Sequence, residues 1–180
     1  LRNRIEPAAS RAVNQNHLTA TNPWGRFGAM IPTALPAAGS PTSNLRIRSL
    51  DPLVPPARLL HLLPLDQAAT ATILSGRGDV ERILAGEDAR VMAIVGPCSI
   101  HDIDAARDYA RRLHALAGRV ADRLLVIMRV YFEKPRTTVG WKGLINDPHL
   151  DDSFDVSTGL RLARSLLIEI AGLGLATATE

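Results

Sequence analysis

The sequence has almost no cysteine and no long apolar run. Cys98 is the single cysteine among 180 residues, so no disulfide can form within the chain, which fits a reducing cytoplasmic setting. No 18 apolar residues follow one another without interruption, so the sequence predicts no membrane-spanning helix and no membrane partner. The N-terminus also lacks the apolar segment of a secretory signal. The 22% of charged residues place the chain among soluble globular proteins.

Acidic residues are nearly missing from the first 50 positions, which changes the meaning of the overall charge of +3. Residues 1–50 carry six arginines against one acid, a net of +5, whereas residues 51–180 carry 15 basic and 17 acidic side chains, a net of −2. A nucleic-acid surface needs clustered positive charge on the folded part, so we expect no nucleic-acid partner.

Residues 1–44 lack sustained periodicity, and five prolines interrupt any helix, so we expect a disordered arm there. An arginine-rich start with one acid is also found in organellar transit peptides, and that alternative to a cytoplasmic location stays open. The first residue is Leu rather than Met, which suggests an incomplete start of the chain.

An N-terminal extension is expected over residues 45–89. Residues 45–50 alternate apolar with polar side chains and predict a short strand, and a proline-rich turn then leads into a brief helix. From Asp66, a good N-cap, apolar spacing predicts one helix or two, because Gly76 and Gly78 interrupt the pattern.

Three apolar runs of strand length follow, separated by two helical patterns. Strands that are apolar throughout and alternate with helices predict an α/β fold with a parallel sheet covered on its faces. The chain is then either a small open sheet or the opening portion of a (β/α) barrel, which needs about 250 residues in full. The expected strands are 91–95, 124–130 and 175–179, and the expected helices run from Asp102 to Gly118 and from about Ser157 to Gly172.

Residues capable of chemistry follow each predicted strand. Cys98 comes after the first, Arg129 and Lys134 come at and after the end of the second, and Glu180 ends the third. Because the carboxyl ends of parallel strands share one edge of the sheet, we expect these side chains on a common rim.

The loop after the second strand concentrates positive charge within 14 positions. Guanidinium groups bind phosphate or carboxylate through two hydrogen bonds, and lysine adds a point charge, so the loop suits a small molecule with two or three negative charges. The alternative is a solvated basic loop without a ligand. The loop contains Arg129, Lys134, Arg136, Thr137, Thr138 and Lys142.

Cys98 and Glu180 each have two interpretations. A lone cysteine is most often a small core residue, but a thiolate between a strand and a helix N-terminus can be a metal ligand or a nucleophile. His101 lies three positions further on, and one cysteine with one histidine is too few ligands to specify a metal site. Glu180 at a strand end can orient a water molecule or a proton donor.

Two segments of the sequence resemble a known enzyme family. Gly96-Pro-Cys-Ser-Ile-His-Asp102 and the stretch from Met128 to Pro148, with Lys134-Pro-Arg-Thr-Thr-Val-Gly-Trp-Lys-Gly143 at its centre, are similar to the class I 3-deoxy-D-arabino-heptulosonate 7-phosphate (DAHP) synthases. The resemblance extends from about Leu45 to Glu180. The related 3-deoxy-manno-octulosonate 8-phosphate synthases share the barrel but lack this uninterrupted lysine-rich run.

The resemblance implies a fold, a reaction and partners. The fold would be the first three strands of a TIM (β/α)₈ barrel over residues 90–180. The reaction would be an aldol-like condensation of phosphoenolpyruvate with erythrose 4-phosphate and water, which releases phosphate at the first step of the shikimate pathway. A divalent metal ion (Mn, Fe, Co or Zn, not distinguishable) would be the cofactor, and the full-length form would be a homo-oligomer.

The resemblance also assigns roles to individual residues, position by position. Cys98 matches the metal-binding cysteine, and Glu180 matches the acid beside the reacting enol, where the family places a water. Lys134 and Glu180 would be the catalytic residues. Arg129 and Lys134 would contact phosphoenolpyruvate, whereas Arg136 and Thr137 would hold the sugar phosphate.

The 180 residues depart from the family in the metal site. The family's other ligands, a histidine, a glutamate and an aspartate, come from later strands and have no counterpart here. One thiolate cannot hold a catalytic divalent ion, so we predict that this polypeptide by itself is inactive. The alternative function is a non-catalytic anion-binding or regulatory module derived from the same barrel.

Overall fold

The computed structural model describes residues 50–134 and 139–179. From Pro52 onward the described residues belong to one compact unit. The arm predicted at 1–44 lies outside the described residues, as does the strand predicted at 45–50 apart from Leu50, which is in no strand. The predicted boundaries of the arm and the extension therefore stay predictions.

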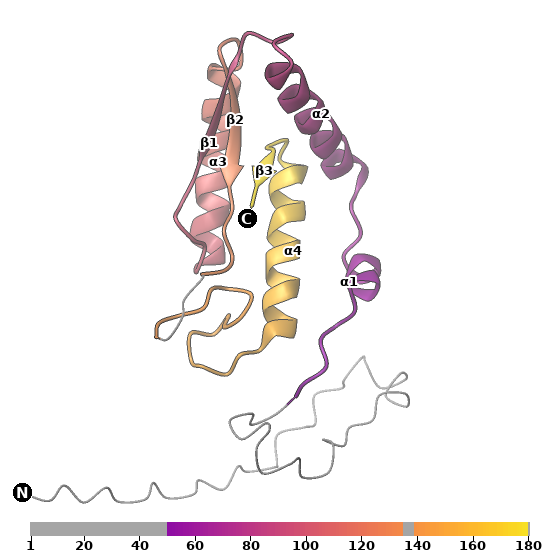
Figure 1. Cartoon of the computed structure of the whole chain (residues 1–180), viewed down its shortest axis with the longest axis vertical. Coiled ribbons are helices and arrows are strands. Elements are labelled where there is room, and N and C mark those ends of the chain that lie inside the picture. The colour runs from indigo at the N-terminus through magenta and orange to yellow at the C-terminus, as the bar shows by residue number, and fades with distance from the viewer. Residues whose placement is uncertain (1–49, 135–138, 180) are drawn as a thin grey trace, which may run out of the picture. The chain divides into compact units, whose positions relative to one another are not determined.

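Helices and strands alternate in the order that the sequence predicted (Figure 1). Helices α1 and α2 precede a β-α-β-α-β succession, which confirms an α/β fold with three strands. None of these four helices has the length and apolar character that a bilayer crossing requires. The elements are α1 (Pro56–Leu62), α2 (Gln67–Leu84), β1 (Val91–Val95), α3 (Ile103–Arg119), β2 (Leu124–Arg129), α4 (Val156–Gly172) and β3 (Thr177–Ala178).

The three strands form a parallel sheet in the order β1-β2-β3. Val91 pairs with Leu124 at the start of the β1-β2 ladder, and Val95 pairs with Met128 at its end. Each crossover between strands carries one helix, α3 or α4, as parallel pairing requires. The sequence therefore predicted both the strand direction and the connections correctly.

The third strand is shorter than the predicted run 175–179. Only Thr177 and Ala178 are in the strand, because the start of the run closes the preceding helix instead. Gly174 adopts φ +89°, a left-handed conformation that glycine tolerates, and the backbone N–H of Leu175 then donates to Ile170 O at 3.3 Å. Ending α4 thus uses Leu175, which the apolar pattern had assigned to the strand.

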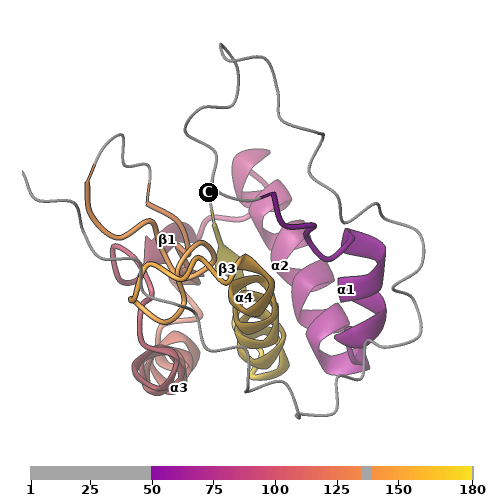
Figure 2. The same cartoon turned by 90° about the horizontal axis from the view of Figure 1, so that it is seen from below.

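Helices α3 and α4 cover one face of the sheet and bury the main core against β2 (Figure 2). Met128 and Val130 are fully buried there. Burying a side chain of this size contributes roughly 1.5–3 kcal/mol, so this packing holds the carboxyl end of β2 firmly. The helix residues in this core are Ala106, Ala110 and Leu113 of α3 and Ala163, Leu166 and Ile170 of α4.

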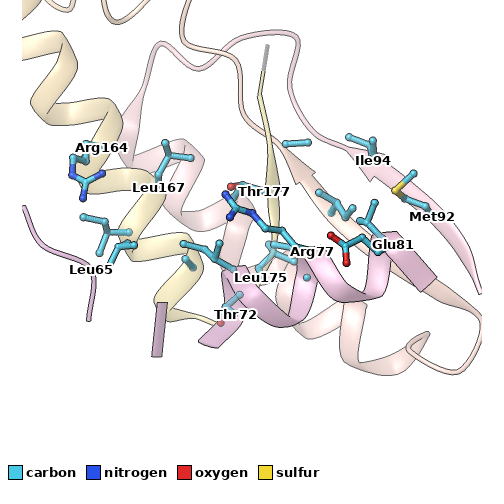
Figure 3. Close-up of a pocket in the computed structure, with 18 residues that line it drawn as sticks. Leu65, Thr72, Arg77, Glu81, Met92, Ile94, Arg164, Leu167, Leu175 and Thr177 are labelled. Carbon is cyan, nitrogen blue, oxygen red and sulfur yellow. The ribbon is translucent and has the colours of Figure 1, made fainter. Parts of the chain in front are cut away.

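Strand β1 is not buried on both faces as its sequence predicted. Val91 is 64% exposed and Ile94 is 50% exposed, because β1 is an edge strand of the described sheet. The face opposite α3 borders an open groove of about 610 Å³, lined by side chains from α2, α4 and the strands (Figure 3). Ile94 and Ile127 contribute the strand side of this groove.

Helix α2 is one continuous helix, although its two glycines left this open in the sequence. Asp66 caps its N-terminus by accepting from the Ala69 backbone N–H at 2.7 Å. A Cβ atom at Gly76 would lie 2.9 Å from the Cβ of Ala176, so the glycine allows α2 to approach the chain before β3 closely. Gly76 therefore serves packing between elements and does not end the helix.

An ion pair between α3 and α4 gives the fold a pH-dependent contact. Arg107 donates to both carboxylate oxygens of Glu169, at 2.7 and 2.9 Å, and this hydrogen bonding lowers the pKa of Glu169 below its ordinary value of 4.5. A lowered pKa means that the ionised carboxylate stabilises the fold above the ordinary value, and that this stabilisation is lost as the pH falls below it.

We expect Glu169→Gln to lower the free energy of unfolding at neutral pH by at most about 1 kcal/mol, because both partners are partly exposed and solvent screens the pair. The deficit should shrink as the pH falls below the ordinary carboxyl value of 4.5, since the unmodified carboxylate then becomes protonated. Urea unfolding on both sides of this value measures it, with Glu87→Gln on an exposed turn as the control. A pH-independent deficit would contradict the electrostatic origin.

Candidate functional site

The carboxyl ends of β1 and β2 bring two loops together. A Cβ atom at Gly96 would lie 2.4 Å from Arg129 O, so the absence of a side chain lets the loop after β1 pass over the end of β2. Further on, the backbone N–H of Ile100 donates to Tyr131 O at 2.8 Å. These contacts place Cys98 next to the chain that follows β2.

Cys98 and Lys134 are in direct contact, although 36 positions separate them. The Lys134 ammonium donates to Cys98 O at 3.2 Å and lies 2.8 Å from Cys98 Sγ. Cys98 is exposed, so its interpretation as a core residue is wrong. Thiolates, rather than thiols, bind metals and attack electrophiles, and a neighbouring ammonium is one of the settings in which they occur.

Arg129 is the last residue of β2 and is half-buried at the same edge of the sheet. Its Cζ atom lies 3.8 Å from the centre of the Tyr131 ring. Its Nε atom is buried and has no hydrogen-bond partner within the described residues. The ion pairs found in ranges 50–134 and 139–179 include neither Arg129 nor Lys134.

The two ends of the basic loop are joined at its base. The backbone N–H of Lys134 donates to Lys142 O at 2.9 Å. Gly143 adopts φ +109°, and a Cβ atom there would lie 2.3 Å from Phe132 O, so the returning chain packs directly against the outgoing one. Lys142 is thereby placed, half-buried, beside Lys134 at the foot of the loop.

Four of the residues singled out in the sequence lie outside the described residues. They are Arg136, Thr137 and Thr138 of the basic loop, and Glu180 at the end of the chain. The structure therefore brings Cys98, Arg129 and Lys134 to the same edge of the sheet. The roles of all the residues singled out in the sequence stay predictions.

Sequence reasoning missed Tyr131 as a member of this rim. The available signal was its position two residues after Arg129. Residues two positions apart in an extended chain point to the same side, and an aromatic ring attracts a guanidinium. A second aromatic contact joins the loops nearby, where the ring of His101 meets Trp141 edge-on with centres 6.3 Å apart. The indole of Trp141 donates to Asp147 O at 2.7 Å, which fixes the loop after Gly143.

The fit of the rim to a metal ion is partial. Cys98 is a suitable soft ligand and lies on the surface. Within the described parts of the chain, no group of three or more His, Cys, Asp or Glu side chains lies close enough to hold an ion. At this rim the described residues thus supply one candidate metal donor, Cys98, beside the cations Arg129 and Lys134.

The sequence of this chain is similar to those of proteins of known family. Residues 65–180 match the DAHP synthetase I family. The Tyr-sensitive phospho-2-dehydro-3-deoxyheptonate aldolase of Salmonella typhimurium is 54% identical over 138 residues, which are 77% of this chain and 39% of that protein. The phospho-2-dehydro-3-deoxyheptonate aldolase of Amycolatopsis methanolica is 55% identical over 137 residues, 76% of this chain and 68% of that protein.

A solved structure shows the same arrangement of elements. The phospho-2-dehydro-3-deoxyheptonate aldolase of Francisella tularensis superposes with a TM-score of 0.72 at 47% identity, over 74% of this chain and 39% of that one. The chain thus spans about two fifths of the length of the Salmonella and Francisella proteins. Three parallel strands alternating with helices are consistent with part of a (β/α) barrel.

Proposed function

Because this chain belongs to the DAHP synthetase I family, we propose that it serves the condensation of phosphoenolpyruvate with erythrose 4-phosphate and water. The products are 3-deoxy-D-arabino-heptulosonate 7-phosphate and phosphate, and the reaction is the transferase step that opens the shikimate pathway. The observation that carries the proposal is the rim formed by Cys98, Arg129 and Lys134. Its two cations form no ion pair with a carboxylate among the described residues.

The rim offers phosphoenolpyruvate two cations of different kinds. Arg129 presents a planar fork, and Lys134, which uses two of its three N–H donors on Cys98, keeps a third for a ligand. Arg136 and Thr137 are proposed to hold the phosphate of the sugar. Two phosphates repel each other in solution, and fixed cations offset this repulsion and align the reacting carbons.

Cys98 is proposed as one ligand of a divalent metal ion, which would polarise the aldehyde carbonyl when bound. Glu180 is proposed to orient the attacking water. Further ligands are needed beyond the described residues, and we therefore propose that the 180 residues by themselves bind reactants without turnover. The complete form would be a cytoplasmic (β/α)₈ barrel that assembles with copies of itself.

Isothermal titration calorimetry on the 180-residue chain tests the proposal. We expect saturable binding of phosphoenolpyruvate with a Kd within about 1 µM to 1 mM, the range in which the KM values of enzymes usually fall. Erythrose 4-phosphate should bind to the same sample once phosphoenolpyruvate is present. Absence of heat with both compounds would refute the proposal.

The alternative function, a non-catalytic anion-binding module, is favoured by one observation. The cations of the rim are present, whereas no group of metal ligands exists within ranges 50–134 and 139–179. A module of this kind would bind inorganic phosphate and phosphoenolpyruvate with similar affinity. The synthase proposal instead expects phosphoenolpyruvate to bind at least about 10-fold more tightly, since its carboxylate and phosphate can each meet a cation.

A further inference from the structure

The Arg129 guanidinium lies over the face of the Tyr131 ring, 3.8 Å from its centre. Burying a charge without a partner is costly, and Arg129 is half-buried with no ion pair inside the described ranges. A cation–π contact offsets part of that cost. The ring therefore stabilises the guanidinium without neutralising its charge, which remains available to an anion.

The backbone of Tyr131 has little freedom to move. Its neighbours in the chain, Val130 and Phe132, are both buried, at 0% and 5% exposure. Its own carbonyl accepts from the Ile100 backbone N–H at 2.8 Å, which ties it to the loop that carries Cys98. The backbone on which the ring stands is thus held from both sides.

A long arginine side chain loses rotamer entropy when a ligand immobilises it. A side chain that already rests on a fixed ring has lost part of this freedom before the ligand arrives, and binding is correspondingly tighter. The Nε atom of Arg129 is already buried, so the outer nitrogens are the ones left to meet a ligand.

We propose that Tyr131 is a positioning residue, whose ring holds the Arg129 guanidinium in the orientation that binds the carboxylate or phosphate of phosphoenolpyruvate. The inference rests on the proposed function and deepens it. In this proposal the π face of Tyr131 carries the role, and Tyr131 acts on the ligand through Arg129.

Two substitutions separate the ring from the hydroxyl. Tyr131→Phe keeps the π face and should bind phosphoenolpyruvate within about 2-fold of the unmodified chain, whereas Tyr131→Leu should bind it about 3- to 30-fold more weakly. Calorimetry on the 180-residue chain measures both. Equal affinity of Tyr131→Leu and the unmodified chain overturns the proposal, and so does a Tyr131→Phe chain as weak as Tyr131→Leu.

A nuclear magnetic resonance readout tests the contact itself. Protons of the Arg129 guanidinium, assigned by their loss in Arg129→Lys, should be shifted upfield by the ring in the unmodified chain and in Tyr131→Phe, and not in Tyr131→Leu. Absence of this shift in the unmodified chain overturns the proposal even if Tyr131→Leu does not fold. If phosphoenolpyruvate fails to bind while the shift is present, the proposed function is what fails, and the positioning of Arg129 for that ligand fails with it.

Discussion

Replacement of Lys134 by alanine is expected to weaken phosphoenolpyruvate binding about 10- to 150-fold. A hydrogen bond to a charged group contributes about 1.5–3 kcal/mol, and this ammonium is already held at the rim by Cys98 O and Sγ. Its loss removes a positioned donor and one of the two cations of the rim, Arg129 and Lys134, neither of which forms an ion pair among the described residues. Calorimetric titration of the variant with phosphoenolpyruvate measures the change.

Arg123→Ala is the matched control for Lys134→Ala. Arg123 is 86% exposed in its side chain and precedes β2, at the opposite end of the same strand. Its removal takes away the same unit of charge without touching the rim, so phosphoenolpyruvate binding should stay within about 2-fold of the unmodified chain. Similar losses in both variants would show that the ligand responds to the overall charge and not to a contact at Lys134.

The second large effect is expected at Gly143. Gly143→Ala should lower the free energy of unfolding by about 2–6 kcal/mol, since two separate costs add. Its φ of +109° is a conformation that side chains other than glycine rarely adopt, which costs about 1–3 kcal/mol. A Cβ atom there would also lie 2.3 Å from Phe132 O, and relieving such crowding costs about 1–3 kcal/mol more.

Gly86→Ala separates the two costs. Gly86 also has a positive φ, +76°, but a Cβ atom there would meet nothing within 4 Å. Its substitution should therefore cost only the conformational part, about 1–2 kcal/mol. Urea unfolding of the two variants gives the comparison. Equal destabilisation would mean that the chain around Phe132 moves aside at no cost, and that the base of the basic loop is less tightly packed than its contacts indicate.

Local signals in the sequence predicted most of the elements. Asp66 and Asp102 were recognised as N-caps, and both accept hydrogen bonds from backbone N–H groups of the helices that they begin. A cap and a periodic apolar pattern depend on residues within a few positions of one another, so sequence alone contains the information. Parallel pairing followed from the alternation of apolar runs and helices.

The errors came from contacts made outside each element. β1 looked like a buried strand, but its burial depends on what covers it, and Val91 and Ile94 remain largely exposed in the described residues. The apolar run 175–179 was predicted to be strand from its first residue, but Leu175 ends α4 instead. The composition of a segment shows that it can be buried or extended. Whether it is buried or extended in the fold depends on the elements that pack against it.

By itself, the sequence determined that a cationic loop follows the second of the parallel strands and that Cys98 comes shortly after the first. It also determined the family that the motif resembles. Tertiary structure alone decided that the Lys134 ammonium meets Cys98 Sγ and that Arg129 rests on Tyr131. The reason is physical: spacing and composition report interactions within a few residues, whereas the contact across 36 positions exists because the crossover from β1 through α3 to β2 and the glycine at 96 bring the two loops together.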